Sequence, residues 1–128
     1  TAFEILARMG LEAEADRLCG QMSHADRKLV EIAMALATEP RLLLLDEPAA
    51  GLAPGETERV IGTLREMVSA GGVTVVLVEH DMDLVFSMAD RVVVFHQGRI
   101  LADGSPEDIR RNPVVKEVYL GGTFAGRP

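Results

Sequence analysis

An acidic pair that follows a run of leucines is the strongest chemical signal in the sequence. Asp46 and Glu47 come directly after Leu42–Leu45 and are followed by Pro48. In open parallel sheets, ligands bind beyond the carboxyl ends of the strands, where these two carboxylates are expected. One carboxylate could hold Mg²⁺, which prefers oxygen ligands, and the other could orient or deprotonate a water molecule. The alternative is a solvated acidic strand end that only leads into a turn.

A histidine and a serine are further candidates. His80 ends the next predicted strand, so it should share a sheet edge with the acidic pair, where it could contact a phosphate or a water molecule. Ser23 begins a predicted helix whose free N–H groups and positive dipole end could bind an anion. The alternatives are that both residues merely cap helices. His24 and His96 have no metal-ligand spacing with Cys19, so no zinc site is expected, and Ser23 has no evident triad partner.

The segments around these residues predict an α/β fold, because short apolar runs alternate with segments of helical periodicity. Helices are expected over residues 2–9, from 23 to 40, over 56–69, from 81, from 105, and over about 113–120. Strands are expected over 42–45, 73–78, 92–95 and 99–102, the last two as a hairpin. The runs at 42–45 and 73–78 show no polar alternation, which predicts parallel strands buried on both faces.

Composition and charge narrow the class of protein. With 48% hydrophobic residues the 128-residue chain can bury a core, and its net charge of −7 argues against a nucleic-acid partner. Cys19 is the only cysteine, so a reducing compartment is expected. No apolar run approaches the ~18 residues of a membrane-spanning helix. The chain begins without a signal-peptide pattern or an initiating Met, and we expect it to be part of a longer protein.

Four segments together resemble the ABC transporter ATPase family, in matching order and spacing over nearly the whole chain. They are Met22–Lys28 (the signature motif, usually Leu-Ser-Gly-Gly-Gln), Leu42–Glu47 (Walker B with the catalytic glutamate), Ala50–Ala53 (the D-loop) and Val78–Asp81 (the switch-histidine region). Three further features resemble the ATP-binding subunits of branched-chain amino acid importers. They are Glu47–Leu52, Ala89–Val92, and Ile109-Arg110 with Glu117–Gly121.

The resemblance implies the carboxyl-terminal half of a P-loop NTPase (RecA-like) domain, that is, a single incomplete ABC ATPase domain. Residues 1–40 would end the helical subdomain and carry the signature helix. Residues 41–128 would form the rear half of the RecA-like core, with a hairpin and helices at the carboxyl end. In the family, the strand that carries Walker A lies between the strand ending at His80 and the strand at 92–95.

The resemblance also implies roles in ATP hydrolysis. Asp46 would bind Mg²⁺ through water, Glu47 would be the general base, and His80 would contact the γ-phosphate. The signature positions, which would contact the ATP held by a second ATPase subunit, are Ser23, His24, Ala25 and Asp26. The D-loop positions are Ala50, Gly51, Leu52 and Ala53.

The sequence departs from the family pattern in three places. Ala25 stands where the signature usually has its second Gly, and its methyl group is expected to crowd the approach of a phosphate. Ala53 stands where the D-loop usually has Asp or Asn, so a hydrogen bond across the subunit interface would be lost. No Gly-x-x-x-x-Gly-Lys-Ser/Thr motif and no Q-loop occur. We therefore expect no productive ATP binding by this chain alone. We also expect the two unpaired strand edges to lead to self-association, to an exchange of elements between copies, or to a rearrangement that closes the gap.

The implied partners are a second ATPase subunit, identical or related, and membrane permease subunits served indirectly by a periplasmic or extracellular solute-binding protein. The implied location is cytoplasmic, at the inner face of the cell membrane. Two alternatives stay open. One is an ABC ATPase of repair or translation, and the other is a non-catalytic dimerisation or binding module derived from such an ATPase.

Overall fold

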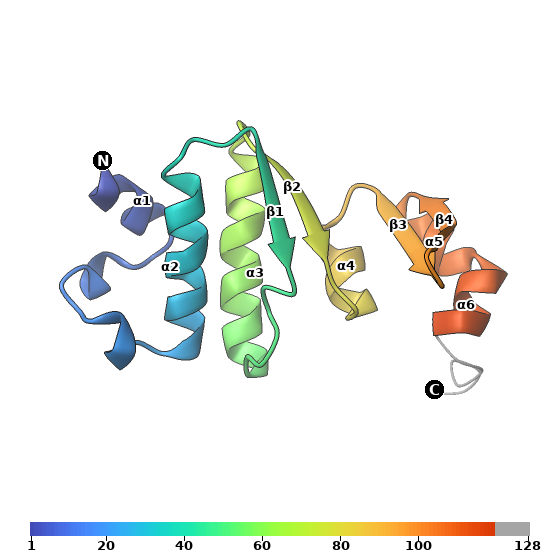
Figure 1. The fold of residues 1–128 in the computed structure, drawn as a ribbon, viewed down its shortest axis with the longest axis horizontal. Helices are drawn as coiled ribbons and strands as arrows, with labels where there is room; N and C mark the ends of the chain where they lie inside the picture. The colour runs from blue at the N-terminus through green and yellow to red at the C-terminus, as the bar shows by residue number, and fades with distance from the viewer. Residues whose placement is uncertain (120–128) are drawn as a thin grey trace. The chain divides into compact units, whose positions relative to one another are not determined.

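The computed structural model describes residues 1–119 and divides the chain into two compact units, one over Thr1–Glu79 and one that begins at His80. The elements of the first unit are α1 (Ala2–Arg8), the 3₁₀ turns η1 (Glu12–Glu14) and η2 (Cys19–Gln21), α2 (His24–Leu36), β1 (Leu42–Asp46), α3 (Pro54–Ser69) and β2 (Thr74–Val78). Those of the second unit are α4 (Met82–Met88), β3 (Val92–His96), β4 (Arg99–Gly104), α5 (Pro106–Arg111) and α6 (Pro113–Tyr119) (Figure 1). Mixed helices and strands confirm the predicted α/β class, while Leu120, the predicted end of the last helix, lies outside the described residues.

The helix α2 begins and ends for local reasons. The Ser23 hydroxyl caps its amino end by accepting a hydrogen bond from the Asp26 N–H at 3.0 Å. Its buried face comprises Ala25, Asp26, Leu29, Ile32 and Ala33, which matches the expected helical spacing. The helix ends at Leu36, earlier than the predicted end at Pro40. Glu39 has a φ of 51°, a left-handed conformation in which an α-helix cannot continue.

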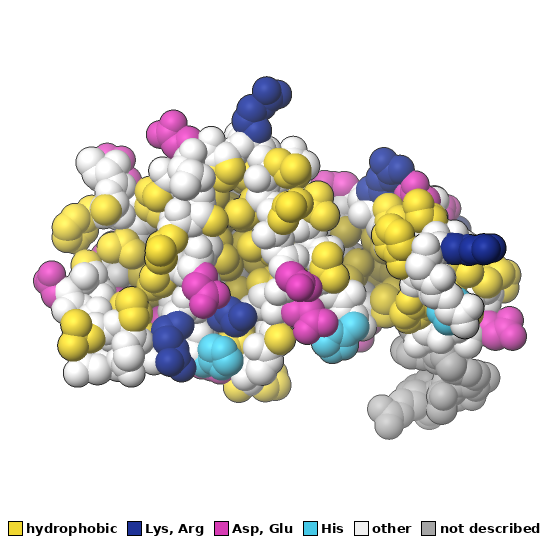
Figure 2. Space-filling model, viewed as in Figure 1, with side chains coloured by type: hydrophobic (Ala, Val, Ile, Leu, Met, Phe, Trp, Pro, Cys, Tyr) yellow, Lys and Arg dark blue, Asp and Glu magenta, His cyan; other side chains and the backbone are white. Residues whose placement is uncertain are grey.

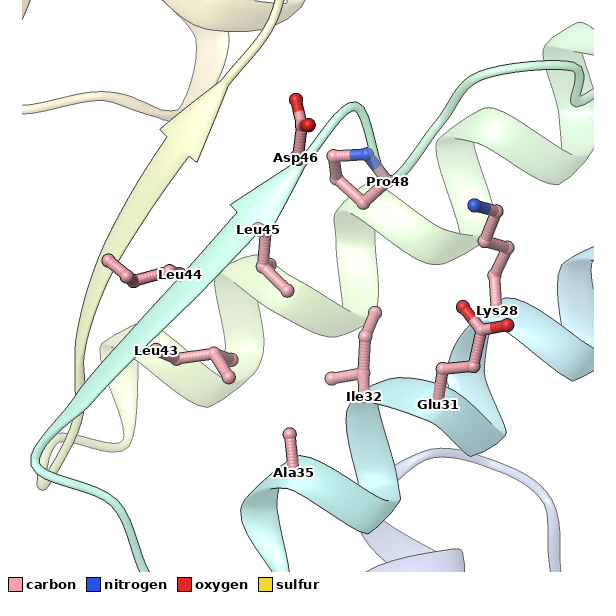
Figure 3. A pocket seen from close by; sticks show the side chains of 9 residues that line it. All are labelled: Lys28, Glu31, Ile32, Ala35, Leu43, Leu44, Leu45, Asp46 and Pro48. Carbon is pink, nitrogen blue, oxygen red and sulfur yellow. The ribbon is translucent and has the colours of Figure 1, made fainter.

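Strands β1 and β2 form a parallel pair, in register from Leu42 opposite Thr74 to Asp46 opposite Val78. The helices α2 and α3 lie side by side next to this pair (Figure 1). Leu43, which is 5% exposed, and Leu45 point toward α2, whereas Leu44 points away from it (Figure 3). The buried residues that α3 contributes to this core are Val60, Ile61, Leu64 and Met67.

The prediction that these strands are buried on both faces is wrong. Leu44 is 68% exposed and Leu42 is 52% exposed, and Val76 and Val78 on β2 are about as open, at 48% and 57%. The reason is that the helices α2 and α3 of the first unit cover only one face of the pair, so alternate residues stay exposed although most of them are apolar. Hydrophobic side chains are accordingly visible at the surface of this unit (Figure 2).

The second unit is built on the predicted hairpin. Strands β3 and β4 pair antiparallel, and the two turn residues Gln97 and Gly98 have φ values of 49° and 75°, as a tight two-residue hairpin turn requires. Arg91, just before β3, makes two hydrogen bonds to the Asp103 carboxylate on β4, at 2.8 and 2.6 Å. The core of this unit consists of Val92, Val94, Ile109 and Val115.

The two strand edges for which the resemblance predicts no partner, those of β2 and β3, stay unpaired among residues 1–119. Among residues 1–119, β2 pairs only with β1, and β3 pairs only with β4. Each of these strands therefore keeps one row of backbone N–H and C=O groups available to another strand. No helix in the described part of the chain is long and apolar enough to cross a membrane.

One-sided burial predicts opposite results for two adjacent leucines. Leu43→Ala should lower the free energy of unfolding by about 2–4 kcal/mol, because it leaves a cavity in the core of the first unit. Leu44→Ala, the matched control one residue along, should cost less than about 1 kcal/mol, because that side chain is already exposed. Urea unfolding of the 128-residue chain, followed by circular dichroism, measures both. Equal losses would mean that both faces of β1 are covered.

Candidate functional site

The chain turns sharply out of β1 at the acidic pair. Asp46 is the last strand residue and is exposed. The Glu47 N–H still donates to the Val78 carbonyl at 2.9 Å, but its φ of 44° is left-handed. A hydrogen bond of 3.0 Å from the Ala50 N–H to the Glu47 carbonyl then closes a turn with Pro48 at its second position. Because Glu47 leaves the strand conformation, strand alternation no longer forces the two carboxylates onto opposite faces.

The conformation of Glu47 is itself informative. A non-glycine residue with a left-handed backbone costs on the order of 1–3 kcal/mol, and such residues gather at functional sites, where surrounding contacts hold them. Here the Val78 and Ala50 hydrogen bonds hold the residue from both sides. The structure thus places the predicted general base at a locally strained and firmly fixed position.

Glu79 ties the end of β2 to this turn. Its carboxylate accepts a hydrogen bond from the Ala49 N–H, at a long distance of 3.4 Å. The residue is half-buried and follows directly after the strand that pairs with β1. No role was predicted for Glu79 from the sequence. The available signal was that a carboxylate follows the second parallel strand, just as Asp46 and Glu47 end the first.

The acidic pair offers the kind of oxygen donors that a magnesium ion prefers. No group of three or more His, Cys, Asp or Glu side chains in residues 1–119 is arranged to hold a metal. Mg²⁺ is usually bound by one or two protein carboxylates, with water and substrate phosphates as its other ligands. Asp46, exposed at the strand end beside Glu47, provides that kind of donor set without forming an all-protein cage.

The start of α2 carries a charged network. The Ser23 hydroxyl donates to one Asp26 carboxylate oxygen at 2.7 Å, and the other oxygen pairs with Arg59 of α3, also at 2.7 Å. Ser23 and His24 are exposed, whereas Asp26 is 9% exposed. Ala25 is 1% exposed, so its methyl group packs into the unit. The ion pair between Asp26 and Arg59 was not predicted, and neither was the position of the negatively charged Asp26 carboxylate next to the Ser23 hydroxyl.

The pKa of Asp26 lies below its ordinary value. Burial by itself would raise the pKa, because it disfavours the charged carboxylate. Hydrogen bonds from Ser23 and Arg59, together with the positive charge of Arg59, outweigh that effect. Asp26 is therefore ionised at neutral pH, and its negative charge is held next to the amino end of α2.

The loop before α3, which holds the predicted D-loop positions, lies next to the start of α2. Gly51 has a φ of 76°, and a β-carbon there would lie 3.4 Å from Cε1 of His24. Ala53 precedes α3 without a capping side chain, and its N–H is instead satisfied by the Glu56 carboxylate at 3.1 Å. The structure therefore places His24 and Gly51, which are distant in sequence, side by side.

His80 is the first residue of the second unit and is exposed. It follows directly after Glu79, but the helix beyond it is capped by Asp81, whose carboxylate accepts from the Leu84 N–H at 3.1 Å. Asp81 thus performs the capping that was one possible role of the histidine. The phosphate contact suggested for His80 stays a prediction.

A shallow cleft of about 220 Å³ lies between α2 and the end of β1. Ile32 and Leu43 contribute apolar surface to it (Figure 3). Lys28 and Asp46 line it with opposite charges near the start of the helix and the end of the strand. In Figure 2, acidic and basic side chains also gather toward the end of this unit at which β1 and β2 finish.

Family models match two parts of the chain. The model described as ABC transporter matches residues 1–50, which include the start of α2 and the acidic pair. The model described as branched-chain amino acid ATP-binding cassette transporter matches residues 99–125.

Curated proteins are similar over most of the chain. The high-affinity branched-chain amino acid transport ATP-binding protein BraF of Pseudomonas aeruginosa is 47% identical over 116 residues, which are 91% of this chain and 46% of BraF. LivG of Escherichia coli, named for the same transport, is 44% identical with the same coverage. The lipopolysaccharide export system ATP-binding protein LptB of Acidithiobacillus ferridurans is 38% identical over 94% of this chain and 50% of LptB. The chain thus spans about half the length of the curated relatives it matches.

Solved structures show the same fold. The ADP conformation of an ATP-binding cassette of an ABC transporter matches with a TM-score of 0.83 and 35% identity, over 94% of this chain and 48% of that one. A nucleotide-free ATP-binding cassette from an ABC transporter matches with a TM-score of 0.82 and 34% identity, over 92% and 48%.

Loss of the Arg59 partner should destabilise the chain in a pH-dependent way. Arg59→Met should lower the free energy of unfolding at neutral pH by about 1 kcal/mol, since it leaves a largely buried carboxylate without its ion pair, although Arg59 itself is half exposed. A carboxyl group whose pKa is lower in the folded chain than in the unfolded chain stabilises the fold at pH values above its unfolded pKa, which is about 3.9. This stabilisation is lost as the pH falls through the folded-state pKa. The difference from wild type should therefore shrink in acid.

Urea unfolding at a series of pH values tests this expectation. Arg65→Met, which alters an exposed arginine on the same helix, is the matched control and should change little at any pH. A loss that is the same at pH 7 and in acid would show that Arg59 acts through packing and not through the Asp26 charge.

Proposed function

Because the chain belongs to the family of ABC transporter ATP-binding domains, we propose that it is the carboxyl-terminal half of the ATPase subunit of a branched-chain amino acid importer. The observation that carries this proposal is the turn after β1. A strained, hydrogen-bonded Glu47 directly follows an exposed Asp46 at the carboxyl end of a parallel strand, an arrangement that suits a site for Mg-ATP hydrolysis.

In this proposal each carboxylate has one task. Asp46 holds Mg²⁺ through a water molecule, and the bound ion supplies charge neutralisation for the phosphates. Glu47 orients and deprotonates the water that attacks the γ-phosphate. Glu79 holds the turn through its contact with Ala49, and His80, directly after it, contacts the γ-phosphate. The chain contains no phosphate loop, so residues from a Walker A segment must complete this site.

The start of α2 serves a second nucleotide. Ser23, with the exposed end of the helix, would contact the γ-phosphate of ATP held by a second ATPase subunit, identical or related. The contact of His24 with Gly51 supports this assignment, because it couples the signature positions to the D-loop positions at the same interface. Closure of the two subunits would drive membrane permease subunits from the cytoplasmic face, and a solute-binding protein would deliver the solute.

The assignment of a substrate class depends on the sequence at the carboxyl end of the chain. The match over residues 99–125 is to a model of branched-chain amino acid transporters, and both BraF and LivG are named for that transport. The 38% identity to a lipopolysaccharide export ATPase indicates that the catalytic half is similar across transporters with different cargo. No observation favours a repair or translation ATPase, or a non-catalytic module.

A hybrid protein tests the catalytic assignment. The part of BraF that precedes its matched segment is joined to residues 1–128, and ATP binding and hydrolysis are measured for the hybrid and for the chain alone. We expect hydrolysis by the hybrid and no tight Mg-ATP binding by the chain alone, because the phosphate cradle is supplied only in the hybrid. Glu47→Gln in the hybrid should lower the rate at least about 100-fold while ATP binding is retained.

The matched control is Glu66→Gln, which alters an exposed glutamate on α3 and should leave the rate of the hybrid unchanged. Unimpaired hydrolysis by the Glu47→Gln hybrid would refute the role of Glu47. Tight Mg-ATP binding by residues 1–128 alone would refute the need for a phosphate loop.

We also propose that the 128-residue chain self-associates through β2. This strand combines an unpaired edge with the exposed side chains of Val76 and Val78, so it presents both hydrogen-bonding groups and apolar surface to a second copy. Light scattering over a concentration series should detect dimers or larger species. Val76→Lys should shift the population from these species toward monomer, because burial of an unpaired charge in the contact between two copies has a high free-energy cost.

Met34→Lys is the control for self-association. Met34 is 69% exposed on α2, so this variant adds the same charge away from the strand edge and should behave as the wild type does. A wild-type chain that stays monomeric at all concentrations would contradict the proposed role of β2.

A further inference from the structure

The hydroxyl group of Ser23 is fully engaged within its own helix. It donates its proton to the Asp26 carboxylate at 2.7 Å and accepts the Asp26 N–H at 3.0 Å. A serine that contacts a phosphate must donate that same proton to a phosphate oxygen. The Ser23 proton that the proposed function requires for a phosphate oxygen is therefore already donated to Asp26.

We propose that Asp26 is a positioning residue that sets, and weakens, the affinity of the start of α2 for a phosphate group. The inference rests on the proposed function of Ser23 and adds to it the way in which this half-site is regulated. Asp26 stands at the position at which the usual signature has a neutral Gln, so this chain replaces an amide with a charged carboxylate. An anion that approaches Ser23 must displace the hydroxyl from Asp26 and also overcome repulsion from its charge.

A second helix in the chain shows which part of this arrangement is ordinary. At the start of α5, the Ser105 hydroxyl donates to the Asp108 carboxylate at 2.7 Å and accepts the Asp108 N–H at 3.2 Å. The hydrogen-bonding pattern is thus a common helix cap. Asp108 is exposed, whereas Asp26 is 9% exposed and is fixed by its ion pair with Arg59.

The ion pair explains why the carboxylate stays in place. Arg59 reaches Asp26 from α3 and holds one carboxylate oxygen, while Ser23 holds the other. The carboxylate therefore cannot rotate away from the serine without losing a charged hydrogen bond. Binding of a phosphate at Ser23 is coupled in this way to the packing of α3 against α2.

Removal of the negative charge of Asp26 should strengthen the binding of anions at the start of α2. In the 128-residue chain, the probe is inorganic phosphate, and binding is followed by NMR through the backbone amide signals of residues 24–26. Asp26→Asn, which keeps the shape of the side chain, should bind phosphate about tenfold more tightly than wild type. Asp26→Gln, which restores the usual signature residue, is the second variant in case the first does not fold. A dispersed amide spectrum verifies folding of each.

Asp108→Asn is the matched control, since it alters the same kind of cap on α5, and it should leave phosphate affinity at residues 24–26 unchanged. Adding Ser23→Ala to Asp26→Asn should remove the gain, because the released hydroxyl is then absent. If wild type binds phosphate as tightly as the folded Asp26 variants, the inference is wrong while the proposed function stands. If no variant binds phosphate at residues 24–26, the inference and the anion site at Ser23 both fail, and hydrolysis by the BraF hybrid shows whether the catalytic assignment survives.

Discussion

Burial of one face of the β1/β2 pair under α2 and α3 is the constraint on which the first unit depends. Leu43 lies between the strand pair and the two helices, and its burial sets the position of β1 relative to α2. The turn at Glu47 and the start of α3 follow from that position, because the chain must leave β1 and return along the same face. The contact between His24 and Gly51 is then a consequence of packing and not of local sequence preference.

Two polar links join the ends of these elements that carry the predicted site residues. The Asp26–Arg59 pair joins the start of α2 to α3, and the Glu79 carboxylate joins the end of β2 to the turn after β1. Each link is made by a carboxylate that is wholly or partly buried, and a buried charge without a partner would be costly. The stability of the core and the geometry of the site therefore depend on the same side chains.

The strain at Glu47 fits this picture. A left-handed glutamate is unfavourable by itself, and it persists because the strand pair holds its N–H while the turn holds its carbonyl. The other side of the same strand pair is not held in this way. Among the described residues, no strand pairs with the free edge of β2, and no side chains cover Leu44 and Val76. A well-ordered acidic turn and an uncovered sheet face coexist in one unit, which suits half of a larger domain.

The sequence by itself determined most of the caps and turns, which depend on neighbouring residues. The helix caps at Ser23, Asp81 and Ser105, the hairpin turn at Gly98 and the acidic strand end at Asp46 were all predictable, because caps and turns depend on a few consecutive side chains. The signature and Walker B motifs were equally readable, and they led to the family. The left-handed backbone of Glu47 was foreseen only as a break in the strand caused by Pro48.

Only the tertiary structure decided which contacts form between distant segments. A strand of apolar residues has the same sequence pattern whether one of its faces or both are covered. The sequence therefore could not show that Leu44 is exposed while Leu43 is buried. The partners of Asp26 and Glu79 come from other elements, thirty residues away in the case of Glu79, and periodicity carries no information about such pairs. The acidic pair could thus be read from its position after the leucines, but what holds it in place, and what holds Ser23, depended on how the helices pack against the strands.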